Sequence, residues 1–226
     1  MSAIQNARST SWGSIPELRF DVEGSSSLEY AAVPTLKFAL RIDATGGQQV
    51  RSILLDVQIQ IAARQRGYEP AAQARLLELF GTPERWGTTL RTLPWLRTTV
   101  VVPAFSDSTL IDLLVPCTYD LEVTASRYLA AIDDGLVPLE FLFSGSVFFA
   151  TREGALQTAR IPWDQEVDYA LPVADWKDTM DRHFPHSAWL RLGAERFERL
   201  CSYKARHAFE SWDATIDSLL RGEGST

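Results

Sequence analysis

The sequence predicts an α+β protein with an antiparallel β-sandwich-like N-terminal domain and a smaller C-terminal α/β unit. Three observations predict this class. Segments with an apolar residue at every second position recur along residues 17–161, which is typical of strands that bury one face. Turn-forming residues, and rarely helices, separate these segments. Beyond residue 162, apolar residues recur at the three-to-four-residue spacing of helices.

The first strands alternate most clearly. A strand over residues 18–24 precedes a long hairpin whose two arms cover residues 35–43 and 50–64. The pair Gly46-Gly47 supplies the turn, because glycine readily adopts the positive φ that tight turns need. The residues expected to face the core are Leu18, Phe20, Val22, Leu36, Phe38, Leu40, Ile42, Leu55, Val57, Ile59 and Ile61.

A short helical insertion is expected near residues 70–90. Pro70 suits the first turn of a helix, and Gly81 suits its end. The segment TPERWGTTLRTLPW then forms a second short turn or a loop, after which LRTTVVVPAF and TLIDLLVP again have strand character.

A second hairpin is predicted over residues 119–150. In its first arm, Tyr119, Leu121, Val123 and Ala125 alternate with polar residues, and the arm continues to residue 132. The sequence Asp-Asp-Gly at 133–135 is a strong hairpin turn signal. The return arm buries one face and is interrupted at a glycine that indicates a bulge. That face and that glycine are Val137, Leu139, Phe141, Phe143 and Gly145. A last strand covers residues 155–163.

These patterns predict a flexible N-terminal arm over residues 1–16 and the sandwich over 17–161. The helical α/β unit follows over 162–221, and a flexible tail over 222–226. The segment from residue 190 to 220 is amphipathic and predicts a helix that is broken near 208–211. Such a helix packs against its own domain or binds in the groove of a partner protein, and the pattern fits both.

Composition excludes several classes of protein. The net charge of −7 and the pI near 5.0 disfavour nucleic-acid binding, which needs a basic surface. The chain shows neither a secretory signal nor an apolar run long enough for membrane insertion. Cys117 and Cys201 have no metal-binding or disulfide-scaffold spacing. We therefore expect a cytoplasmic protein.

The stretch DTMDRHFPH at 178–186 concentrates the groups most capable of chemistry. Asp178, Asp181, His183 and His186 are accordingly the first candidates for a catalytic site. The apolar spacing upstream instead predicts a helix that starts at Pro172 and ends before Pro185, with His183 in its last turn. Because a proline interrupts the two histidines and no third ligand follows, we expect no metal site.

Other motifs of chemistry do not occur. The sequence has no nucleophile elbow, phosphate loop or dinucleotide fingerprint, so no cofactor is expected. Trp86 and Trp95 flank a long aromatic connection and are the candidates for partner binding. The alternative is that both rings fold back and cover an open end of the sandwich.

The segments IPWDQEVDYALPVADWKDTMDRHFPHSAWLRL and YKARHAFESWDATIDSLL, with VPTLKFALRI and PLEFLFSGSVFF, carry a resemblance. The chain resembles an uncharacterised bacterial domain family of unknown function. That resemblance implies genes located near those of high-affinity nickel–iron hydrogenases, and hence an accessory role. A weaker similarity is to SecB-type export chaperones. Their central hairpin is similar to the segment VPTLKFALRIDATGG…VRSILLDVQIQ.

We therefore expect a non-enzymatic protein-interaction or accessory protein, with a hydrogenase subunit as the candidate partner. The alternatives are an enzyme or a small-ligand binder with its site in the C-terminal unit, and a SecB-like chaperone.

Overall fold

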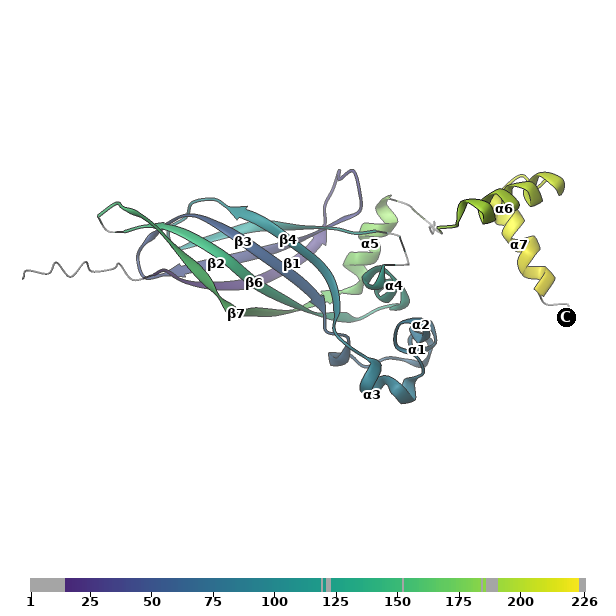
Figure 1. The fold of residues 1–226 in the computed structure, drawn as a ribbon, viewed down its shortest axis with the longest axis horizontal. Coiled ribbons are helices and arrows are strands. Elements are labelled where there is room, and N and C mark those ends of the chain that lie inside the picture. Colours follow the sequence, from purple (N-terminus) through teal and green to yellow (C-terminus); the bar gives the residue numbers. More distant parts are fainter. Residues whose placement is uncertain are drawn as a thin grey trace, which may run out of the picture. The chain divides into compact units, whose positions relative to one another are not determined.

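The computed structural model describes residues 15–118, 120, 123–151, 153–183, 185 and 191–223. The chain divides into two compact units, Met1–Ala188 and Trp189–Thr226. Figure 1 shows the strands of the first unit and the helix pair of the second. None of the described helices combines the length and apolar character needed to cross a bilayer.

The described part of the first unit contains two antiparallel sheets. The three-stranded sheet has the order β1-β2-β5, and the four-stranded sheet has the order β4-β3-β6-β7. The α+β class with antiparallel sheets is thereby confirmed. The strands are β1 (Glu17–Ser27), β2 (Thr35–Thr45), β3 (Gln49–Ile61), β4 (Leu93–Val102), β5 (Ser108–Pro116), β6 (Leu136–Ala150) and β7 (Leu156–Pro172).

Short helices connect the strands at one end of the sandwich (Figure 1). The predicted insertion near residues 70–90 is present as a chain of such turns, with Pro70 opening the first of them. The connecting elements are η1 (Ala63–Gln65), α1 (Pro70–Arg75), α2 (Leu77–Phe80), η2 (Pro83–Arg85), α3 (Trp86–Thr89) and α4 (Thr124–Ala131), and α5 (Val173–His183) follows the last strand.

The core lies between the two sheets and is built from the predicted apolar faces. Every residue predicted to face inward on β1, β2, β3 and β6 is buried. Phenylalanines link the layers. Phe20 stacks on Phe143 with ring centroids 4.5 Å apart, and Phe38 meets Phe141 edge-on at 5.2 Å. Such aromatic contacts add to the free energy of simple apolar burial.

The predicted hairpin over residues 35–64 is wrong, although both of its arms form strands. β2 pairs with β1 and β5, whereas β3 pairs with β4 and β6. Gly46 and Gly47 do form a turn with positive φ, of 107° and 73°. That turn carries the chain from one sheet to the other. Alternation fixes which face a strand buries, and it leaves the identity of the neighbouring strand open.

The predicted strand through residue 132 is also wrong, because Thr124–Ala131 forms α4. Tyr119 and Leu121, on which the alternation rested, lie outside the described residues. Within α4, the buried side chains Ala125, Tyr128 and Leu129 follow helical spacing. The turn at 133–135 therefore joins a helix to β6.

The predicted boundary at 161/162 falls inside β7, which continues to Pro172. α5 follows directly and buries Val173, Trp176 and Met180, as its predicted spacing requires. The Ser25 hydroxyl donates to the Asp175 carboxylate, which ties α5 to β1. These contacts place α5 in the first unit.

The described part of the second unit is helical, with α6 (Ala194–Arg206) and α7 (Trp212–Glu223). The predicted break between the helices occurs at residues 207–211, where Ala208 has a φ of 52°. The strand content implied by the predicted α/β unit lies in β7, and hence in the first unit.

A bulge interrupts β6 and β7, as the glycine at 145 indicated. Phe143 pairs with Gln165 and Gly145 pairs with Ile161, so residues 162–164 of β7 stand opposite a single residue of β6. Gly145 has a φ of 137°. A Cβ atom there would lie 2.1 Å from the carbonyl oxygen of Leu54, so only glycine fits.

We expect Gly145→Ala to lower the free energy of unfolding by about 3 kcal/mol, because it adds a forbidden φ and a backbone clash. Chemical denaturation measures this loss. Gly24→Ala is the matched control, since a Cβ at that strand position meets no atom within 4 Å. Equal stability of the two variants would contradict the close approach.

Candidate functional site

The predicted catalytic cluster does not converge in the described residues. His183 is half-buried, with Nδ1 3.1 Å from the carbonyl oxygen of Thr179 and Nε2 3.0 Å from that of Ala31. Both ring nitrogens thus face backbone carbonyls and fix the end of α5. Asp178 and Asp181 point into solvent, and His186 lies outside the described residues. No group of three metal-binding side chains occurs among those described.

The two tryptophans predicted to bind a partner pack against the core. Trp86 lies edge-on to Tyr68 and Phe80, with centroids 5.2 and 6.0 Å away, and its Nε1 donates to the carbonyl oxygen of Gly81 at 2.9 Å. Trp95 is half-buried and meets Phe38 edge-on at 6.3 Å. These contacts favour the covering role, and partner binding by either ring stays a prediction.

We expect Trp86→Ala to lower the free energy of unfolding by about 2 to 3 kcal/mol, because it opens a cavity between Tyr68 and Phe80. The melting temperature should fall by about 5 °C or more. Leu220→Ala, in the exposed part of α7, is the control and should change stability by less than about 0.5 kcal/mol. An unchanged melting temperature for Trp86→Ala would contradict the packing role.

The two cysteines are free thiols in different environments. Cys117 is buried at the end of β5, and its Sγ lies 3.6 Å from the carbonyl oxygen of Val115. Burial raises the pKa of the Cys117 thiol to about 12. Cys201 is only partly buried, on α6. The thiolate is the reactive form, so Cys117 is protected twice, by access and by ionisation.

At pH 8, roughly one Cys117 thiol in ten thousand is ionised in the folded chain. A disulfide reagent should therefore react rapidly with one thiol per native chain and with two after unfolding. Cys201→Ser should abolish the rapid phase and leave the slow one. A rapid phase that survives this substitution would contradict the burial of Cys117.

The α6–α7 hairpin is held by its loop and by a few side chains. Lys204 Nζ donates to the carbonyl oxygen of Phe209 at 2.6 Å, which draws residues 207–211 back along α6. The rings of Tyr203 and His207 lie 4.4 Å apart, and those of His207 and Phe209 lie 5.6 Å apart. α7 therefore begins beside the middle of α6, and not beyond its end.

Several side-chain contacts join the two helices, among them Lys204 Nζ, which lies 5.6 Å from the centroid of the Trp212 ring. The Phe197 and Trp212 rings lie 5.7 Å apart, and the hydroxyls of Tyr203 and Ser218 are 3.1 Å apart. Thr215 is the one buried side chain among the described residues 191–221. A pair of helices with so little buried area lacks a hydrophobic core of its own.

The hairpin consequently exposes large apolar side chains. Leu220 is 62% exposed and Phe197 is 48% exposed. Contiguous apolar side chains on a surface typically mark a site of interaction. The exposed set is Leu192, Phe197, Trp212, Ile216, Leu219 and Leu220.

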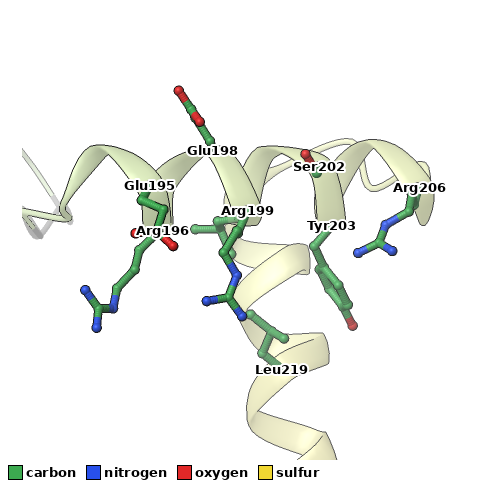
Figure 2. A pocket seen from close by; sticks show the side chains of 9 residues that line it. Glu195, Arg196, Glu198, Arg199, Ser202, Tyr203, Arg206 and Leu219 are labelled. Atoms are coloured by element: carbon green, nitrogen blue, oxygen red, sulfur yellow. The ribbon is translucent and has the colours of Figure 1, made fainter.

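An open hollow of about 660 Å³ lies in the angle between the helices. Arg196, Arg199, Arg206 and Tyr203 line it together with Glu195 and Glu198 of the same helix, and Leu219 contributes from α7. Figure 2 shows Arg196, Arg199 and Tyr203 extending from α6 toward the side of Leu219, whereas Glu198 points the opposite way. Among the described residues, these three arginines make no ion pair. The lining thus carries three arginines against two glutamates, beside the apolar surface of Leu200 and Leu219.

A second, smaller hollow of about 200 Å³ lies on the four-stranded sheet beside the β6–β7 bulge. The bulge displays Trp163, which is 91% exposed. Asp56, Gln58, Arg97 and Ser144 complete the polar lining. The flat ring of Trp163 lies beside hydrogen-bond donors and acceptors, among them one acidic and one basic side chain. This arrangement suits a small polar ligand with one apolar face.

The model of a family of unknown function (DUF6084) matches residues 15–226. The chain belongs to this family. The match to DUF6084 includes both units and the α6–α7 hairpin. The resemblance to a family of unknown function is thereby confirmed, and the link to hydrogenase genes stays a prediction. No curated protein matches the sequence.

Solved structures similar to this DUF6084 chain are distant. A protein assigned as ApaA from Bordetella pertussis is 13% identical, over 70% of this chain and 95% of its own, with a TM-score of 0.27. β-glucosidase 3B from Thermotoga neapolitana is 11% identical, over 69% of this chain and 17% of its own, with a TM-score of 0.26. A β-glucosidase from Kluyveromyces marxianus is 10% identical, over 69% of this chain and 15% of its own, with a TM-score of 0.25. Likeness at this level carries no argument about function.

Sequence reasoning missed the arginine row of α6. The signal is the spacing of Arg196, Arg199 and Arg206, which at 3.6 residues per turn places all three within about 80° of the helix circumference. Glutamates at 195 and 198 alternate with them and conceal the row when the sequence is read linearly.

Proposed function

We propose that this chain is a non-enzymatic accessory protein that binds another protein through the α6–α7 hairpin. The observation that carries the proposal is the near absence of buried side chains in a hairpin that exposes five large apolar ones, with Leu192 exposed just before it. Covering them with a partner would remove apolar surface from water at about 25 cal/mol per Å². Aromatic anchors such as Phe197 and Trp212 are the residue types that dominate binding energy at interfaces.

The arrangement of titratable groups supports binding over catalysis. The acids and the histidine described in 178–183 do not face a common point, and His183 is occupied by two carbonyls. Burial raises the pKa values of Tyr68 and Tyr128, whose hydroxyls are 2.7 Å apart. Both rings pack within the core, so this pair stabilises the fold.

A hydrogenase subunit in the cytoplasm is the candidate partner that the family resemblance implies. The hairpin geometry supports the class of partner, a protein with a complementary apolar surface, and the resemblance alone supplies this particular candidate. A SecB-like chaperone would also hold its clients through exposed apolar side chains, and it differs by accepting many unrelated chains. The Trp163 hollow supports a second candidate function, the binding of a small polar ligand.

The proposal is tested by capture from the source organism with the tagged full-length chain. We expect Ile216→Asp with Leu220→Asp to abolish capture of the partner, because each carboxylate would be buried in the interface at a cost of several kcal/mol. Quantitative mass spectrometry of the captured proteins measures this loss, and a hydrogenase subunit among them would identify the candidate.

Leu156→Asp, at an equally exposed apolar position on β7, is the matched control and should leave capture intact. The double variant should also keep the melting temperature of the wild type, since both altered side chains are exposed. Capture that is lost equally in the control, or retained in the double variant, would contradict binding through the hairpin.

A further inference from the structure

The hollow between α6 and α7 is more selective than an apolar patch. Resting on the proposed function, we infer that the segment it receives is an acidic amphipathic helix of another protein. Its carboxylates would pair with the arginine row of α6, and its apolar stripe would cover the exposed side chains of α7.

The arginine row sets the spacing of the partner's charges. Arg196 and Arg206 are ten residues apart on one face of α6, which corresponds to about 15 Å along the helix axis. Arg199 stands between them. A helix with acids every three or four residues presents carboxylates about 5 Å apart, so one such interval matches Arg196 to Arg199 and two match Arg199 to Arg206. Guanidinium groups also hold carboxylates in bidentate geometry, which fixes the register of docking.

The apolar floor sets the second requirement. Leu200 and Leu219 line the hollow alongside the arginines, and Ile216 and Leu220 extend the apolar surface along α7. An extended acidic peptide would pair with the arginines and leave this surface in water. A helix with an apolar stripe beside its acidic one covers both, so the amphipathic helix is the occupant that the lining favours.

The charge distribution of the chain favours an acidic protein segment over nucleic acid or anionic lipid as the partner. Residues 191–223 hold six basic and six acidic residues, so the net charge of −7 resides in the rest of the chain. Nucleic acid and anionic lipid present broad negative surfaces, which that charge repels. A single acidic helix carries far fewer negative charges than either of these surfaces, so this repulsion is weaker for it. A second copy of this chain would bring another −7, which opposes self-association.

The test uses a fluorescent helical peptide of about 18 residues, with leucines at i, i+3, i+4 and i+7 and glutamates flanking that stripe. Its binding to the full chain is followed by fluorescence anisotropy. A peptide with lysines at the glutamate positions and one with serines there are the matched probes. We expect the glutamate peptide to bind at least about tenfold more tightly than either.

The arginine row is tested by the variant R196Q/R199Q/R206Q. It should weaken the binding of the glutamate peptide by about tenfold to a hundredfold. It should also make that binding insensitive to salt between about 50 and 300 mM. It should leave the serine peptide unchanged. R19Q/R91Q/R160Q, which removes the same charge from exposed arginines of the first unit, is the control and should bind as the wild type does.

Four outcomes would overturn the inference. Equal binding of the serine and glutamate peptides would show that only the apolar surface binds. The proposed function would then stand, and the inference of an acidic partner would be wrong. Tighter binding to vesicles of anionic lipid than to the peptide, lost in the same variant, would assign the row to a membrane surface. Sedimentation showing a dimer of the chain alone that the variant dissociates would assign the hollow to a second copy. Binding of no probe would contradict both proposals.

Discussion

The contact of two phenylalanine pairs across the sandwich is the constraint on which the first unit depends. Phe20 and Phe38 come from the three-stranded sheet, and Phe143 and Phe141 meet them from the four-stranded sheet. Two sheets that share one core must keep the register of their inner faces, because a slip of one residue would turn every ring to solvent.

The apolar faces of the strands could be predicted from the sequence because burial requires alternation, and the side chains from Leu36 to Ile42 alternate without exception. The partners of those strands could not. β2 and β3 bury their faces in the same core, so the pattern is identical whether they pair or lie in opposite sheets. Helix α4 was missed because the alternation of the residues just before it was extended into it. The buried positions of Tyr128 and Leu129 follow the helical period instead.

The candidate site was predictable in part, for reasons of the same kind. The amphipathic pattern of residues 190–220 and its break near 208 follow from local spacing. Whether the apolar stripe was covered depended on tertiary contacts, which no local pattern encodes. At Trp86 the same limit led to the reverse error. The sequence suggested an exposed binding anchor because an aromatic side chain lies in a long connection. Its contacts with Tyr68 and Phe80 come from residues brought near by the fold.

The strand order also constrains how this chain folds. β2 pairs with β5 between Thr35 and Pro116, and β3 pairs with β6 between Gln49 and Ala150. Each pairing joins residues that are many tens of positions apart, so loop closure must precede most of the sheet. On the ribosome, the first three strands emerge well before β6 is synthesised. Their apolar faces therefore spend that interval without the layer that covers them, which makes early exposure to aggregation or to chaperones a property of the topology itself.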